Sequence, residues 1–240
     1  MATMGLKTHK RLAPRRWADK QSRTWYLTIR FLLQLIFRFY VRRFRAYGVG
    51  NVPAEGSAFL VANHASGIDP LMMGVGIPHR ILLGPGKVEI FKNPVFTYVM
   101  EKIGIFPLHQ GTADAAAVRT MVDAYRKGRI VVVYPEGGRS KTGEMMPFME
   151  DFTRLVIKLR ACLIPAGIAG ARELLPLGSW IPRPDTACAV VIGEPFDLSE
   201  FEGRGLSAEV LAEATAVLWN RVHDMVQEAE ERRQTLAADQ

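Results

Sequence analysis

The chain has 240 residues, of which 48% are hydrophobic and 23% are charged. This composition is that of a globular protein with one sizeable core, and it excludes a disordered chain. The two cysteines, Cys162 and Cys188, lie in apolar runs without polar neighbours. They are expected to be buried, reduced core residues rather than catalytic thiols.

Positive charge is concentrated at the N-terminus. Residues 1–48 hold twelve of the 31 Lys and Arg residues and one of the 24 acidic residues, so this segment carries +11 and the remainder −4. The sequence therefore predicts a basic arm on a slightly acidic domain, with nucleic acid or an anionic membrane surface as the candidate partner. Residues 1–22 are expected to form a flexible tail.

The segment at 23–46 favours the membrane over nucleic acid. Arg30, Gln34, Arg38 and Arg42 recur every four residues, and the other positions carry aromatic and aliphatic side chains. This pattern is typical of a helix that lies in a membrane interface, and a helix that covers the core is the alternative. The segment contains no charge-free run of roughly 18 residues, so a transmembrane span is not predicted. No small-residue cleavage site follows it, so a signal peptide is not expected either.

After a break at 48–53, apolar runs and helical patterns alternate, which predicts an α/β sheet covered by helices. Thr112 is the expected N-cap of the helix at 112–127, and Gly128 its stop. Strands are expected at 57–63, 80–84, 104–108, 129–134, 162–168 and 187–193, and helices at 70–76, 93–102, 112–127, 150–161 and 207–232.

The first of these strands is followed by a histidine and an aspartate, His64 and Asp69, in the segment NHASGIDP. An aspartate that accepts from one imidazole nitrogen fixes the tautomer and leaves the other nitrogen as a base. The alternatives are that Asp69-Pro70 is only a helix cap, or that the two side chains are part of a metal site.

A second loop with chemistry follows the β-branched run at 129–134. It reads PEGGRSKTG and presents Glu136, Arg139 and Lys141 after a strand, where α/β proteins place ligands. The spacing of its glycines and lysine is not that of a Walker motif.

These two segments resemble motifs of the glycerolipid acyltransferases. NHASGIDP resembles their NHxxxxD motif and YPEGGRS their FPEGTRS motif. Residues 87–91 and 104–108 are similar to the middle block of the family, and residues 163–170 to its apolar proline motif. The four blocks occur in the family's order over roughly residues 45–195, and the bacterial 1-acyl-glycerol-3-phosphate acyltransferases are the most similar members.

The resemblance implies one mixed α/β sheet covered by helices, with an interfacial helix in a segment at 1–47 and a catalytic domain at 48–240. It implies transfer of an acyl group from a thioester, acyl-CoA or acyl carrier protein, to the hydroxyl of a lysophospholipid, most simply 1-acyl-sn-glycerol 3-phosphate. His64 is the implied base and Asp69 its orienting partner, without metal or cofactor. The implied substrate-binding residues are His109, Glu136, Gly137, Gly138, Arg139 and Ser140.

The reduced cysteines fit a cytosolic location, and the basic arm with its interfacial helix fits peripheral attachment, so the protein is expected on the cytoplasmic face of the cell membrane. Three departures from the family pattern leave the acceptor open. His109 stands where the family has Arg, Gly138 stands where it has Thr, and residues 148–152 read FMEDF where the family has a basic, glycine-containing stretch. Another lysophospholipid, a lyso-ornithine lipid or a glycolipid is an alternative acceptor. A non-catalytic peripheral membrane protein with this fold is the alternative to an enzyme.

Overall fold

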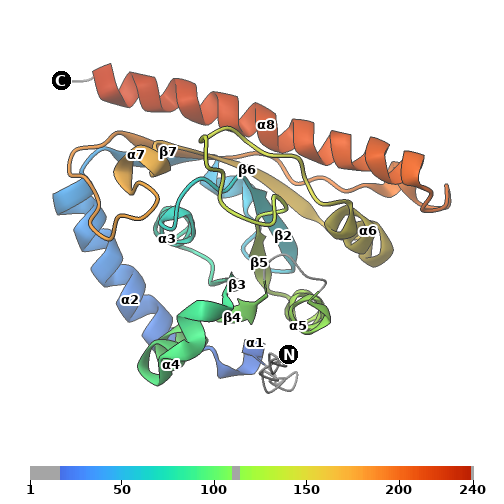
Figure 1. Ribbon diagram of the computed structural model, residues 1–240, viewed down its shortest axis with the longest axis horizontal. Coiled ribbons are helices and arrows are strands. Elements are labelled where there is room, and N and C mark those ends of the chain that lie inside the picture. Colours follow the sequence, from blue (N-terminus) through green and yellow to red (C-terminus); the bar gives the residue numbers. More distant parts are fainter. Residues whose placement is uncertain (1–16, 110–113, 239–240) are drawn as a thin grey trace, which may run out of the picture.

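The computed structural model describes residues 17–109 and 114–238. Its centre is one seven-stranded sheet in the order β1-β7-β6-β2-β5-β3-β4. Figure 1 labels the strands of this sheet from β7 to β4. All neighbouring strands are parallel except β6 and β7, so the sheet is mixed, as expected. The strands are β1 (Phe44–Tyr47), β2 (Ala58–Ala62), β3 (Leu82–Lys87), β4 (Ile105–Leu108), β5 (Ile130–Val133), β6 (Leu163–Ala169) and β7 (Cys188–Ile192).

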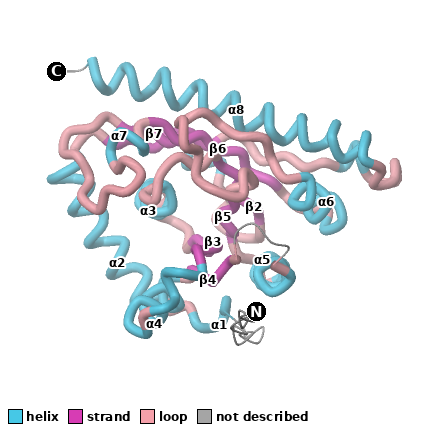
Figure 2. Tube along the Cα trace, in the orientation of Figure 1, coloured by secondary structure: helices cyan, strands magenta, loops and turns pink. Residues whose placement is uncertain are grey.

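Helices cover both faces of the sheet (Figure 2). They are α1 (Trp17–Lys20), α2 (Arg23–Ile36), α3 (Asp69–Gly76), α4 (Pro94–Ile103), α5 (Ala115–Arg126), α6 (Glu150–Leu159), α7 (Ala171–Leu174) and α8 (Ala208–Ala238), with the shorter turns η1 (Phe37–Val41), η2 (Val49–Asn51), η3 (Val88–Lys92) and η4 (Ser199–Phe201). Helices α5, α6 and α8 pack on one face, and α3 with η1 on the other. The middle strands are therefore buried on both sides, which explains why β2, β5 and β6 read as continuous apolar runs.

The N-terminal helix is shorter than the sequence predicted. Helix α2 ends at Ile36, the π-helical turn η1 follows, and Arg42 has a positive φ of 62° where the chain turns. Residues expected to continue the helix instead form β1, which pairs with β7 at the edge of the sheet. A division of the chain at residue 47 would thus separate an edge strand from its sheet.

Helix α2 also belongs to the core. The Tyr26 side chain is buried, and its hydroxyl accepts a hydrogen bond from the Leu82 N–H at 3.2 Å. The outward face of α2 keeps its large apolar side chains exposed, among them Phe31 at 58% and Leu32 at 52%. No helix in residues 17–109 and 114–238 is long and apolar enough to cross a membrane.

The expected flexible tail is wrong for its last residues. Residues 17–20 form α1, where Trp17 packs edge-on against Phe91 with ring centroids 5.8 Å apart. Lys20 pairs with Glu101 at 2.6 Å. The rest of the predicted tail, residues 1–16, lies outside the described part of the chain.

The start of α5 differs from its prediction, whereas its end is confirmed. The N-cap is Asp114, whose carboxylate accepts from the N–H groups of Ala116 and Ala117, each at 3.0 Å. A carboxylate satisfies two open N–H groups at once, which explains its use here. Thr112 lies outside the described residues. Gly128 follows the helix with a φ of 75°, a value that favours glycine.

Helix α8 approaches β6 with backbone against backbone. A Cβ atom placed on Gly167 would lie 2.1 Å from the carbonyl oxygen of Met225 in α8. Only a residue without a side chain permits this contact.

We expect Gly167→Ala to lower the free energy of unfolding by about 1–3 kcal/mol, because the new methyl group must push α8 away from the sheet. Urea unfolding followed by circular dichroism measures the change. Gly50→Ala is the control, because a Cβ at Gly50 has no atom within 4 Å. Equal midpoints for the two variants would contradict the close packing of α8.

Candidate active site

The two motif loops meet at one end of the sheet. Strands β2 and β5 are parallel neighbours, with Val61 opposite Val133, so the loops that follow them leave from the same edge. The Ser140 N–H donates to the His64 carbonyl at 2.8 Å. The carboxyl edge of a parallel sheet is the usual ligand site of such folds.

His64 and Asp69 form a hydrogen-bonded pair. The distance from His64 Nδ1 to Asp69 Oδ2 is 2.7 Å, and Asp69 is fully buried while the His64 side chain is 15% exposed. The same carboxylate oxygen accepts from the N–H groups of Ala65 and Ser66, each at 2.9 Å. Asp69 therefore shapes the loop as well as holding the imidazole, and the tautomer with a proton on Nδ1 leaves the Nε2 lone pair as a base.

Tyr134 supports the imidazole from one side. Its ring stacks on that of His64, with centroids 4.2 Å apart and an interplanar angle of 17°. Burial, followed by the negative charge of Asp69, raises the pKa of Tyr134 well above its usual value, so the phenol remains neutral. Tyr134 begins the YPEGGRS motif, but its position in the sequence does not predict this stacking.

Glu136 has a different place from the one expected. The resemblance implied that it binds substrate, but its two oxygens accept from backbone N–H groups of His64 at 2.7 Å and of Met146 at 2.9 Å. Burial raises the pKa of Glu136. The carboxylate thus joins the His64 loop to the segment at 143–147.

Ser140 is also a structural residue here. It is buried, at 1% exposure, and its hydroxyl accepts from the Gly143 N–H at 3.0 Å. A direct contact between its side chain and a substrate, which we expected from the motif, does not fit this burial. Gly137 has a φ of 71°, which favours glycine, while a Cβ at Gly138 would meet no atom within 4 Å.

Arg139 is the exposed cation of the site. A Cβ placed on Gly67 would lie 3.5 Å from Arg139 Nη1, so the guanidinium lies over the turn between His64 and Asp69. Its planar group of donors is suited to a phosphate or carboxylate.

His109 lies farther along the same edge of the sheet. It follows β4, and the order β2-β5-β3-β4 puts three strand spacings, about 14 Å, between the ends of β2 and β4. The His109 ring is exposed, and its Nδ1 lies 2.8 Å from Asp114 Oδ2. The role at the headgroup that the resemblance implies for His109 stays a prediction.

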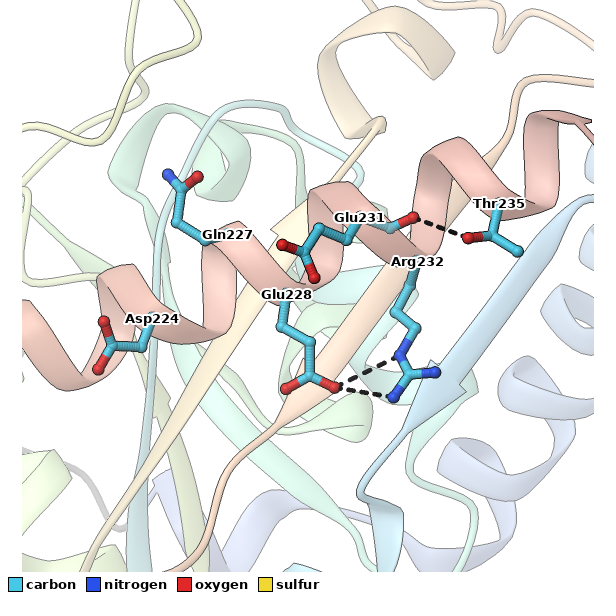
Figure 3. Close-up of a pocket in the computed structure, with 6 residues that line it drawn as sticks. All are labelled: Asp224, Gln227, Glu228, Glu231, Arg232 and Thr235. Atoms are coloured by element: carbon cyan, nitrogen blue, oxygen red, sulfur yellow. Dashed lines mark hydrogen bonds and ion pairs between the residues drawn. The ribbon is translucent and has the colours of Figure 1, made fainter.

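Other reactive features lie outside this site. Burial raises the pKa of the Cys188 thiol to about 12, so it does not form a thiolate at neutral pH. In the part of the chain that the structure describes, no group of three or more His, Cys, Asp or Glu side chains is placed to hold a metal ion. Figure 3 shows a shallow pocket on the surface of α8. Its lining residues all belong to that helix, and two of them, Glu228 and Arg232, form an ion pair. An exposed pair of this kind is common on helix surfaces.

Comparison with known proteins agrees with the geometry of the two loops. A family model for acyltransferases matches residues 43–169, which is more than half of the chain. The chain therefore belongs to the acyltransferase family, and the protein is an O-acyltransferase.

Named relatives lie within this family. A 1-acyl-sn-glycerol-3-phosphate acyltransferase of Bacillus subtilis is 27% identical over 185 residues, which cover 75% of this chain and 87% of that protein. A chloroplastic protein of the same name from Arabidopsis thaliana is 26% identical over 148 residues, which cover 60% of this chain and 40% of that protein. The fold is that of the 1-acyl-sn-glycerophosphate acyltransferase from Thermotoga maritima, with a TM-score of 0.65, 24% identity and coverage of 82% of this chain and 78% of that one.

Replacement of Glu136 by Gln tests its bridging contact. A glutamine keeps the shape, but it has one acceptor oxygen, so its NH₂ group must face the N–H of His64 or Met146. We expect a loss of about 1–3 kcal/mol in the free energy of unfolding. Denaturant unfolding measures it, with Glu144→Gln on the same loop as control, because the Glu144 side chain is exposed. If the two variants unfold alike, the bridge has no role in stability.

Proposed function

We propose that this protein transfers a fatty acyl group from acyl-CoA or acyl carrier protein to the hydroxyl of 1-acyl-sn-glycerol 3-phosphate, giving phosphatidic acid. The observation that carries the proposal is the His64–Asp69 pair, 2.7 Å apart, beside an exposed arginine at the carboxyl edge of the sheet. The names of the relatives support the acceptor.

His64 is the general base in this mechanism. Its Nε2 takes the proton of the acceptor hydroxyl as that oxygen attacks the thioester carbonyl and the new C–O bond forms. The tetrahedral intermediate then collapses, the C–S bond breaks, and the imidazolium returns the proton to the leaving thiolate. Asp69 stabilises the charged imidazolium between these steps. The sequence of steps uses neither a metal nor a cofactor.

The backbone N–H of Gly138 is the proposed donor to the oxyanion. Three of the neighbouring loop N–H groups already have acceptors: those of Ala65 and Ser66 bind Asp69, and that of His64 binds Glu136. Among the described residues the Gly138 N–H has no such partner, and no atom lies close to its missing side chain. An N–H that is oriented in advance stabilises the charge that develops on the carbonyl oxygen.

The acceptor phosphate is proposed to bind Arg139, and the membrane surface to bind the outward face of α2. Trp25, Phe31 and Leu32 are exposed on this face, and the same helix carries Arg23 and Arg30, so that it combines the aromatic, aliphatic and basic residues used by interfacial helices. On this proposal the enzyme is peripheral and acts on lipid at the cytoplasmic face of the cell membrane.

Replacement of His64 by Ala tests the base. We expect roughly a 10²–10⁴-fold loss of turnover, the usual effect of a lost general base. Release of free coenzyme A from acyl-CoA in the presence of lysophosphatidic acid measures it, and His223→Ala on α8 is the control. Turnover near the normal rate in folded His64→Ala protein would exclude this mechanism.

Replacement of Arg139 by Ala tests the acceptor. A charge-assisted contact contributes about 1.5–3 kcal/mol, so the apparent KM for lysophosphatidic acid should rise roughly 10–100-fold. Lys141→Ala is the control, because Lys141 is an exposed cation on the same loop.

A zwitterionic lysophospholipid in the same assay distinguishes the acceptors. If Arg139→Ala affects it as much as lysophosphatidic acid, Arg139 does not select the phosphate monoester. If wild-type protein prefers the zwitterionic lipid, the acceptor proposed here is wrong while the acyl transfer remains.

A further inference from the structure

A closed loop at residues 174–183 presents two large apolar side chains to solvent. The Arg183 N–H donates to the Leu174 carbonyl at 2.7 Å and closes the loop. At its tip Trp180 is 94% exposed and Ile181 is 74% exposed. Tryptophan is rarely placed so fully in water, and such side chains mark interaction surfaces when they gather in a patch.

The 174–183 loop is attached to the catalytic loop. The Ser66 hydroxyl donates to the Leu175 carbonyl at 2.7 Å. Ser66 also donates its backbone N–H to Asp69, the partner of His64. Two hydrogen bonds therefore connect the base of the 174–183 loop to the carboxylate that orients the imidazole.

The same loop lies beside the end of the N-terminal helix. The Tyr40 hydroxyl donates to the Pro182 carbonyl at 3.0 Å. Figure 1 shows the loop, in orange, next to the upper end of α2, in blue. Together the two segments form an apolar rim of exposed side chains: Ile36, Phe39, Tyr40, Trp180 and Ile181.

The charge around the apolar rim is positive. Residues 36–45 and 174–185 contain five arginines and one acid, Asp185, which lies 3.6 Å from Arg42. Another acid, Glu173, immediately precedes the second of these segments. A basic surround attracts anionic headgroups, while tryptophan and tyrosine favour the boundary between headgroups and acyl chains.

We infer that the apolar rim inserts into the surface of an anionic lipid bilayer, with the 174–183 loop as a second attachment point besides α2. Two attachment points fix the orientation of the sheet edge that carries His64 toward the bilayer. This inference rests on the proposed function only in that the lipid acceptor lies in that bilayer.

Vesicle binding by the full-length chain tests the loop. The vesicles contain zwitterionic lipid with anionic phosphatidylglycerol, and neither lysolipid nor thioester, so the result does not depend on acyl transfer. We expect the variant Trp180→Ala/Ile181→Ser to partition onto them roughly tenfold more weakly. Val118→Ala is the control, because Val118 is an exposed apolar residue on α5. The unfolding midpoint of the double variant should equal that of wild type, since both side chains are exposed.

A spectroscopic measurement locates the indole directly. Brominated phosphatidylcholine in the vesicles should quench wild-type tryptophan emission, and Trp180→Phe should lose a large part of this quenching while the protein still binds. Equal partition of the double variant and wild type, or equal quenching in Trp180→Phe, would overturn the inference. Analytical ultracentrifugation without lipid tests the alternative occupant. If wild-type protein is a dimer there and the double variant is a monomer, a second copy, not a bilayer, covers the rim.

Discussion

A catalytic base on one loop and a substrate-binding arginine on another can act on the same substrate only if the two loops keep a fixed separation. In this protein the half-buried carboxylate of Glu136 fixes it, because one oxygen accepts from the His64 backbone and the other from the Met146 backbone. The Ser140 N–H adds a third bond, to the His64 carbonyl. On the proposed mechanism, the position of His64 as a base thus depends on contacts in which its own side chain takes no part.

The two faces of the sheet contribute differently to this arrangement. On one face α8 lies against β6 at backbone distance, through the bare Cα of Gly167. On the other face α3 begins at Asp69, so the helix that packs on the sheet also supplies the partner of the imidazole. A shift of α3 would move the carboxylate and change the orientation of His64.

Much of the fold is readable in the sequence because its middle strands are apolar without interruption. Strands β2, β5, β6 and β7 lie within one or two residues of their predictions. Strand β1 was missed because its residues continue the aromatic and arginine pattern of the helix before it, and its partner β7 lies far along the chain. The local sequence pattern cannot predict a strand pairing between residues so far apart in the chain.

The part of the site that was predicted is the contact between two side chains. The His64–Asp69 contact follows from spacing and from a family resemblance. The structural roles of Glu136 and Ser140 were not predicted. Their partners are backbone N–H groups, and every residue type except proline has one, so the sequence does not indicate which of them is bound. Tyr134 was missed for another reason: stacking on an imidazole depends on how two neighbouring strands end, and the motif alone does not state it.

Tyr26 connects the outward surface to the inside of the protein. Its hydroxyl accepts from β3, while the other side of the same helix bears exposed aromatic residues. On the proposed attachment a bilayer is a ligand of the folded state, and it stabilises the fold by mass action. The protein that has left the membrane is then the less stable form and the better substrate for cellular proteases, so its lifetime in a cell would be tied to the available lipid surface.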